Sequence, residues 1–435
     1  MKQKAKKMNH PKKNYQSQKR TPIFVGLPMS RKLVLATLGC VVLSCTSIQA
    51  QINTGQITGA DLSSEINAVS TMVPFLTISP DSRSASMGDV GVALFNPDAN
   101  SAAWNNANLT FAENKTGFSL SYAPWLRQLV NDVGFSYLSG YSKISKNSAV
   151  SGSFRYFSLG NINFTDFDGN PTGSFNPNEF ALDIGYATKF SEKFAMGVNL
   201  RYIYSNLVGS GVRNGIDYTA GTSVAGDISL IYRDEIRAGG KRHRFNVGLN
   251  LQNIGSKMTY SSEEKRDFIP TNLKFGVGYK YEVDDHNEFF IYADVNKLLV
   301  PTPPFVLKKY NSSADSIDPN TNQVALIGMN KNVNPVQGMV QSFYDAPGGA
   351  SEEIREWTPS VGFEYVYEKI FALRGGAFYE ARTKGARQYL TLGMGLKFES
   401  LTLDAAYLVP FSNRHPLQNQ MRFSLLFDMS SLSDK

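Results

Sequence analysis

Residues that could carry chemistry are few in this chain of 435 residues. His243, His286 and His415 are the histidines beyond residue 50, and their spacing fits no metal site. Asp166 to Asn170 (DFDGN) offers many oxygen ligands. It lacks the later ligands and the terminal Glu of an EF-hand loop, so a plain turn is expected. No G-x-S-x-G motif is present. The sequence therefore predicts no catalytic residue, no cofactor and no metal site.

Seven charged residues are more informative, because alternation assigns each of them to the polar face of a predicted strand. They are Asp183, Arg201, Lys274, Arg374, Glu380, Asp404 and Arg422. An unpaired buried charge is costly, so we expect these residues to pair with one another as a polar network inside a closed sheet. The alternative is that the set binds a substrate.

The elements that must position this set are strands. Large apolar residues alternate with Ala, Gly, Asn and Arg through residues 194–204. The segments 245–252, 390–398 and 421–428 repeat this alternation of apolar with polar or small residues. Successive side chains of a strand point to opposite faces, so each segment has one apolar face and one polar or small face.

A soluble β-sandwich also alternates, but three features favour a transmembrane barrel. The segments run about 10–13 residues, whereas sandwich strands average about 5–6 and about 9–11 residues cross a bilayer. Aromatic residues such as Tyr202, Tyr281 and Phe398 lie near the strand ends, as membrane girdles require. Glycines such as Gly197 and Gly393 lie on the polar face, where a crowded lumen favours small side chains.

The pattern predicts an all-β fold, a 14-stranded antiparallel transmembrane β-barrel with an N-terminal plug segment. The strands are expected near 117–125, 132–143, 148–158, 179–190, 194–205, 219–233, 242–254, 271–283, 287–297, 357–368, 370–380, 387–398, 401–411 and 418–428.

The predicted connections alternate in length. Connections after strands 4, 8, 10 and 12 are very short, such as Glu399-Ser400, and those after strands 3, 5, 7 and 9 are long. Bacterial barrels have short periplasmic turns and long extracellular loops. The chain is therefore expected in the outer membrane with both termini periplasmic.

The N-terminus reads as a secretory signal. An apolar run at 33–43 follows Arg31 and Lys32 and leads to a small-residue cleavage pattern closing on Ala50. Residues 1–50 are thus expected to be a signal peptide with a long basic leader. Two alternatives are a lipoprotein signal using one of the two cysteines, and a true start at Met29. Ten of the 44 Lys and Arg residues lie there, which leaves 34 basic and 37 acidic residues and no basic excess for nucleic acid.

Two segments lie outside the expected strands of the barrel, 117–428. Residues 51–116 precede it, and a fourteen-stranded barrel is too wide for wall side chains to fill, so this segment is expected to plug the lumen. Residues 298–356 form one long extracellular loop, and a loop of that size is normally functional. Residues 429–435 form a C-terminal tail.

Several motifs resemble those of the PorV family, also called LptO, from the type IX secretion system. They are MVPFLTISPDSR (72–83), MGDVGVA (87–93), Asp98-Ala99-Asn100-Ser101, Trp104-Asn105, and LRGGAFYE (373–380) with Lys384-Gly385 and Arg387. The resemblance covers residues 60–430. It implies a FadL-like barrel of fourteen strands with a plug.

The resemblance also implies a binding function. Such a protein receives secreted cargo with a C-terminal signal domain from a translocon barrel and delivers it to a cell-surface sortase complex. Its other partner is outer-membrane lipid. The alternative is a FadL-type channel for hydrophobic small molecules. An enzyme acting on outer-membrane lipid is a third possibility, but the sequence supplies no nucleophile and base for it.

Overall fold

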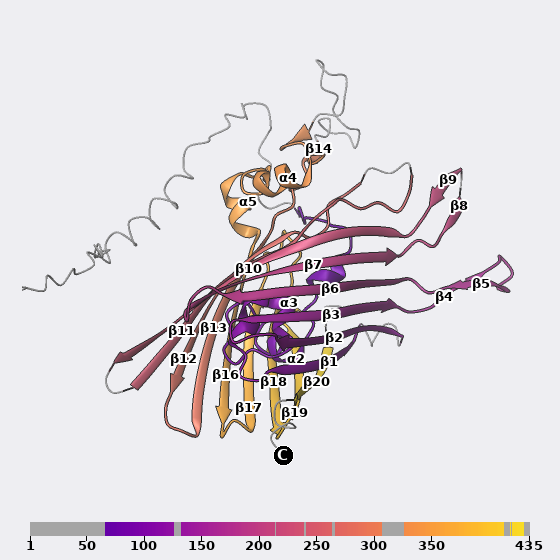
Figure 1. Ribbon diagram of the computed structural model, residues 1–435. Helices are drawn as coiled ribbons and strands as arrows, with labels where there is room; N and C mark the ends of the chain where they lie inside the picture. Colours follow the sequence, from indigo (N-terminus) through magenta and orange to yellow (C-terminus); the bar gives the residue numbers. More distant parts are fainter. Residues whose placement is uncertain are drawn as a thin grey trace, which may run out of the picture. The chain divides into compact units, whose positions relative to one another are not determined.

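The computed structural model describes residues 66–125, 132–213, 215–238, 241–262, 266–306, 326–412, 418 and 420–429. Fourteen of its strands close into an antiparallel barrel in which each strand pairs with the next, and the first pairs with the last (Figure 1). They are β1 (Thr116–Pro124), β2 (Val133–Lys143), β3 (Ser148–Leu159), β6 (Asn178–Lys189), β7 (Phe194–Asn206), β10 (Gly221–Ala238), β11 (Lys241–Gly255), β12 (Asn272–Glu282), β13 (Asn287–Leu298), β16 (Trp357–Tyr367), β17 (Phe371–Tyr379), β18 (Gln388–Phe398), β19 (Leu401–Pro410) and β20 (Gln420–Asp428).

The predicted fold is confirmed, with each expected segment overlapping one barrel strand. The largest difference is β10, which continues to Ala238 where the prediction ends at 233. Charged residues such as Asp234 and Glu235 obscure the alternation there, but the strand continues because it pairs with β11 as far as Lys241.

The connections form two mouths. The described connections at the short-turn mouth are residues 144–147, 190–193, 283–286, 368–370 and 399–400, which join strands by a few residues each. Glu368 and Lys369 both adopt positive φ (50° and 58°), and the Ile370 amide bonds the Tyr367 carbonyl at 3.0 Å. This is type I′ geometry, whose twist matches that of the flanking strands.

The described connections at the long-loop mouth are 160–177, 207–213, 215–220, 256–262, 266–271, 299–306, 326–356, 380–387, 411–412 and 418, together with residues 125 and 132 between β1 and β2. Several of these are folded. They contain the hairpin of β4 (Ile162–Thr165) and β5 (Pro171–Phe175), the hairpin of β8 (Gly211–Arg213) and β9 (Ile216–Tyr218), and β14 (Phe305–Val306) paired with β15 (Leu326–Ile327). The helices α4 (Pro335–Gln341) and α5 (Ala350–Arg355) also lie in the longest connection.

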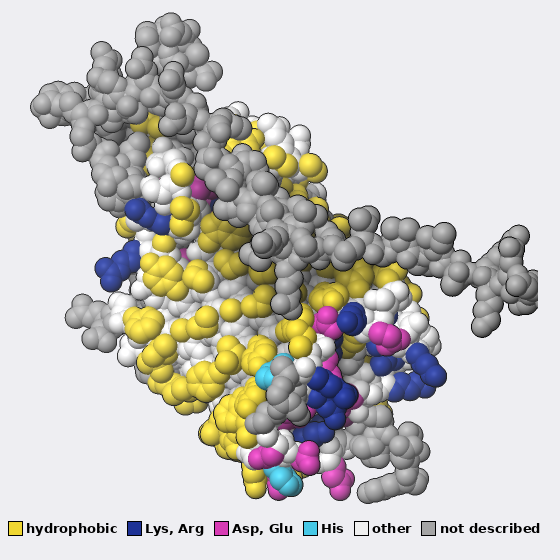
Figure 2. Space-filling model, turned by 90° about the vertical axis from the view of Figure 1, so that its left-hand side faces the viewer, with side chains coloured by type: hydrophobic (Ala, Val, Ile, Leu, Met, Phe, Trp, Pro, Cys, Tyr) yellow, Lys and Arg dark blue, Asp and Glu magenta, His cyan; other side chains and the backbone are white. Residues whose placement is uncertain are grey.

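The wall has one apolar and one polar face, as alternation predicts. On β18, Leu390, Leu392 and Met394 are about half exposed, whereas Thr391 between them is buried. Figure 2 shows hydrophobic side chains gathered over much of the wall, with charged side chains near its lower edge. Among the described residues, no helix is long and apolar enough to cross a membrane.

The lumen holds the chain that precedes β1. This plug consists of residues 66–112 and contains four short helices: η2 (Pro74–Thr77), α2 (Ser82–Ala85), α3 (Ser101–Trp104) and η3 (Asn106–Phe111). The core lies between plug and wall. In its largest cluster, Phe75 and Trp104 of the plug pack with Phe135, Tyr137 and Ile203 of the wall.

Candidate functional site

The plug enters the lumen at the long-loop mouth. The Asn67 amide donates to the Thr383 carbonyl (2.9 Å), and its side chain donates to the Pro303 carbonyl (3.1 Å) and to Glu352 (3.0 Å). The plug leaves at the opposite mouth, where the Lys143 ammonium donates to the Ala112 carbonyl at 2.8 Å. The chain before β1 therefore runs the length of the barrel.

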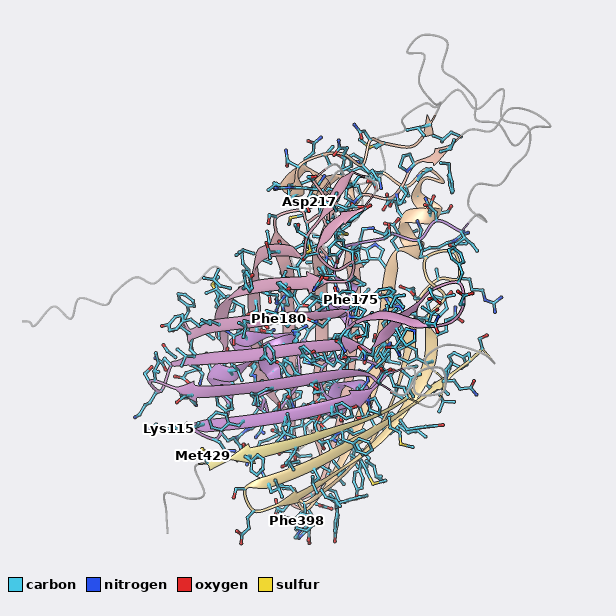
Figure 3. The ribbon with its side chains drawn as sticks, turned by 90° about the vertical axis from the view of Figure 1, so that its right-hand side faces the viewer. Lys115, Phe175, Phe180, Asp217, Phe398 and Met429 are labelled. Carbon is cyan, nitrogen blue, oxygen red and sulfur yellow. The ribbon has the colours of Figure 1, made fainter. Side chains whose placement is uncertain are left out.

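The two chain termini lie outside the described residues, so the expectation that both are periplasmic stays a prediction, but the first and last described residues can be placed. In Figure 3, Lys115 and Met429 mark adjacent strand ends at the short-turn mouth, and Phe175 lies toward the other mouth. Asn67 lies at that other mouth, so the two ends of the described chain are at opposite ends of the barrel. Strand count alone could not reveal this, because it fixes only where β1 begins.

Wall glycines let the plug backbone approach the strands closely. A Cβ at Gly376 would lie 2.1 Å from the Met87 carbonyl carbon, and one at Gly362 would lie 2.5 Å from the Met87 oxygen. A Cβ at Gly248 would be equally close to the Val92 oxygen. The small residues of the polar face are thus explained by backbone contact with the plug.

Two of the seven predicted lumen residues form the centre of one ionic cluster. Arg201 on β7 pairs with Asp183 on β6 (2.5 Å) and with Asp227 on β10 (3.0 Å). Arg201 also donates to Asn253, which lies beside a bulge in the pairing of β10 and β11. The arginine is almost fully buried and compensated by two carboxylates, which fixes three strands together at this level.

Two further predicted residues form a second cluster, which joins wall and plug. Arg374 on β17 pairs with Asp404 on β19 (2.6 Å) and Glu364 on β16 (2.8 Å). Glu364 also binds Arg83 of the plug at 2.8 Å, and Arg83 lies 3.5 Å from Asp98. The cluster therefore holds α2 against the wall.

The other three predicted residues are separate, so the set does not form one network. Lys274 lies over the Trp104 ring, 4.5 Å from its centroid. Arg422 donates to the Ser79 carbonyl of the plug (2.7 Å). Glu380 pairs with Arg387 (2.8 Å) at the long-loop mouth.

The predicted set did not include four buried charged residues, three of them in these clusters and the fourth, Asp294, in contact with the plug. Asp227, Asp294 and Glu364 lie at inward positions of β10, β13 and β16, where the same alternation could have found them. Asp294 accepts from the plug amides of residues 91 and 92. Arg83 had no such signal, because the plug has no periodic pattern.

A third buried ionic cluster, of wall and loops, lies at the long-loop mouth. Lys297 at the end of β13 pairs with Glu356 (2.5 Å) and Glu353 (3.2 Å), and its side chain is fully buried. Lys384 pairs with Glu356 (2.9 Å) and with Glu352 (2.5 Å), the acceptor of Asn67. These bonds tie together the plug entrance and two long loops.

The cap, defined as residues 326–356, is built on this cluster. Burial raises the pKa of Asp345 to about 7, and burial also raises the pKa of Glu353. Burial acts in the same direction on Glu356, but Lys297 and Lys384 outweigh it and hold the Glu356 pKa below its usual value. The cap is thus held by buried ionisable groups, and the pKa of one of them, Asp345, lies near neutral pH.

The larger apolar side chains of helix α4 in the cap are exposed. Asn334 caps it by accepting from the Gln337 amide, and Gly338 is buried, where a Cβ would lie 2.6 Å from the Phe268 ring. The opposite side exposes an apolar cap face. Its members and exposed fractions are Val336 (68%), Val340 (60%), Phe343 (44%), Tyr344 (55%) and, on α5, Ile354 (72%).

The segment DFDGN behaves as a turn. Asp166 accepts from the amides of Asp168 (2.9 Å) and Asn170 (2.8 Å) between β4 and β5. Hydrogen bonds with Asn170 hold the pKa of Asp166 below its usual range. Across the described part of the chain, no cluster of three or more His, Cys, Asp or Glu could hold a metal ion.

The fold and its contents define the class: a β-barrel of the outer-membrane type, closed by an N-terminal plug. The family model of the type IX secretion system protein PorV matches residues 61–305, more than half of the chain. The chain belongs to this family, and it is an outer-membrane component of type IX secretion. No curated protein matches it.

Solved structures of transport barrels are also similar. The toluene transporter TodX of Pseudomonas putida is 12% identical over 83% of this chain and 98% of that chain, with a TM-score of 0.46. The Ralstonia pickettii toluene transporter TbuX is 12% identical over 80% and 97% (TM-score 0.43). A Pseudomonas aeruginosa FadL homologue is 12% identical over 83% and 99% (TM-score 0.40).

Proposed function

We propose that this protein binds secreted cargo at its long-loop mouth and carries it from the translocon barrel to a cell-surface sortase complex. The cargo is expected to share a C-terminal signal domain. The long-loop mouth, with the cap, is placed at the cell surface in this proposal, because bacterial barrels carry their long loops outside. The role is one of binding, without catalysis.

The apolar cap face carries the proposal. Soluble surfaces seldom expose several large apolar side chains together unless a partner covers them. Val336 and Val340 are one helical turn apart on α4 and are both exposed, and Phe343, two residues beyond the helix, is 44% exposed. The buried ionic cluster beneath, centred on Lys297 and Glu356, fixes that surface to the wall, which reduces the entropy lost on binding.

The second candidate, a channel for hydrophobic solutes, has less support. A channel needs an open path through the lumen, and the described plug contacts wall and loops from Asn67 at one mouth to Ala112 at the other. Between these contacts, Arg83 of the plug pairs with Glu364 of β16, and Arg422 of β20 donates to the Ser79 carbonyl of the plug. Conduction would require these contacts to break.

The experiment replaces residues 326–350 with a short Gly/Ser linker and measures cargo secretion in cells. Loop closure entropy depends weakly on length, and Glu352, Glu353 and Glu356 are kept, so the barrel should fold. Docking predicts normal barrel abundance with cargo accumulating in the periplasm. Normal cargo attachment with a well-folded barrel would contradict the proposal, and altered solute uptake alone would favour the channel.

A further inference from the structure

Gly152 on β3 is a glycine that the plug does not explain. It lies on the outward face of the wall, and a Cβ there would meet only the Asp183 carbonyl oxygen, at 3.7 Å. The pairing of β2 with β3 has no register shift, so no bulge requires it. A glycine inside a regular strand often marks a place where a ligand approaches closely.

Gly152 forms the floor of a groove in the outer wall. Its cross-strand partner is Gly140, which also faces outward, and the next outward pair is Leu138 with Phe154. Phe118 and Val150 complete the rim of a cavity of about 400 Å³, lined almost wholly by apolar groups. The next outward positions along the same row of the wall carry large exposed side chains, Ile184 on β6 and Leu200 on β7.

The groove lies in the part of the wall nearer the short-turn mouth. At that end the hydroxyl groups of Thr116 and Ser142 lie 3.3 Å apart, and those of Ser148 and Thr188 lie 3.1 Å apart. Hydroxyl groups at this level suit the boundary between hydrocarbon and headgroups. Beyond them, Lys115 before β1 and Lys146 in the next turn are exposed cations.

We infer that this groove is a binding site for a membrane phospholipid. An apolar hollow in the bilayer cannot hold water at low cost, and the surrounding solvent is hydrocarbon, so an acyl chain fills it. The chain lies over Gly140 and Gly152 between Leu138 and Phe154. The phosphate lies toward Lys115 and Lys146, where cations attract it. The site is independent of cargo docking and lies at the opposite end of the wall.

Native mass spectrometry of the intact barrel, reconstituted in phosphatidylethanolamine vesicles and released in mild detergent, tests this site. The wild type should retain one phospholipid. Gly152→Leu fills the groove without a backbone clash and should reduce the retained fraction at least fivefold. The matched control Ala293→Leu, on the outward face of β13, should retain it fully. Equal retention by Gly152→Leu and wild type would overturn the proposal.

A second measurement needs no substitution and remains decisive if Gly152→Leu fails to fold. A phospholipid with a diazirine on its acyl chain is irradiated in vesicles with the unaltered barrel. Label should concentrate on the tryptic peptide 147–155, which holds Val150, Gly152 and Phe154. Even labelling of all outward-facing peptides would contradict the assignment. So would the finding, in native membranes, that this peptide crosslinks to a protein in place of a lipid.

Discussion

The Asn67 amide bonds the Thr383 carbonyl at 2.9 Å, which places the start of the plug among the long loops. Since β1 begins at the other mouth, the plug crosses the barrel before the wall begins. If the long loops face the cell surface, Asn67 lies on that side of the membrane too.

Cysteine labelling on intact cells tests this topology. The predicted mature chain has no cysteine of its own, so single substitutions are specific. Ile66 is 79% exposed, so Ile66→Cys should react with a membrane-impermeant maleimide. Gly349→Cys should react as well. Ser400→Cys, in a short turn, should react only after the outer membrane is opened. Labelling of Ser400→Cys but not Ile66→Cys on intact cells would invert the assignment.

The wall register is tested by charge. Leu392 is 58% exposed on the outward face, whereas Lys397 lies on the lumen side near Asp428 (3.5 Å). An Arg at the lipid midplane costs about 2–4 kcal/mol, so Leu392→Arg should destabilise the barrel by about that amount. Lys397→Arg should change stability little. Heat-modifiable gel mobility and urea unfolding measure both, and equal effects would contradict the register.

The close contact between the plug and Gly376 can be tested by adding one methyl group at this position. Gly376→Ala forces a Cβ into the Met87 backbone, whereas the Cβ in Gly152→Ala makes only an ordinary contact with the Asp183 carbonyl oxygen at 3.7 Å. Overpacking of this kind costs about 1–3 kcal/mol. Limited proteolysis should cut the plug faster in Gly376→Ala and at the wild-type rate in Gly152→Ala. Equal protection of both would mean that the plug is not packed on this strand.

The buried arginine of the second cluster should matter more than a partly exposed one. Arg374→Met leaves Glu364 and Asp404 without their shared cation, and removing one partner of a buried pair costs about 3–5 kcal/mol. Arg387→Met, at the long-loop mouth, should cost less because its side chain is 41% exposed. Unfolding in urea compares the two, and the reverse order would reject this ranking.

The cap should tighten at acidic pH. Burial raises the pKa of Asp345 to about 7, so the folded cap favours the protonated form more than an unfolded loop does. This contribution is fully present below about pH 4 and is lost as the pH rises through 7. The protection factors of peptide 335–355, which are exchange rates corrected for their intrinsic pH dependence, should therefore be higher at pH 5.5 than at pH 8. Asp345→Asn should reduce this difference, with the remainder due to Glu353, whose pKa burial also raises. An undiminished difference in that variant would contradict the role of Asp345.

Alternation predicted the wall well because period two is imposed by the backbone and by the contrast between lipid and lumen. The pairing of Arg374 with Asp404 followed the same rule, since both residues lie at inward positions, on β17 and β19, and meet over Gly395 of the strand between them. The plug could not be predicted in this way. Arg83 and Asn67 are fixed by contacts with residues far along the chain, Glu364 and Thr383, which leave no local pattern. The exposed apolar side of α4 could not be predicted either, because a helix of seven residues is too short to show a clear helical periodicity in the sequence.

An affinity measurement with purified cargo tests whether the cap face is the docking surface. The triple variant Val336→Ser, Val340→Ser, Phe343→Ser is compared with Ile162→Ser, Phe164→Ser, Phe167→Ser, whose residues are also exposed but lie on the β4–β5 hairpin and its turn. Each reconstituted barrel is titrated with a purified C-terminal signal domain. If cargo docks on the cap face, the cap variant should raise Kd at least tenfold, which is a loss of about 1.4 kcal/mol of binding free energy. The hairpin variant should bind with a Kd near that of the wild type. An unchanged Kd in the cap variant, with the barrel folded, would contradict docking on this face.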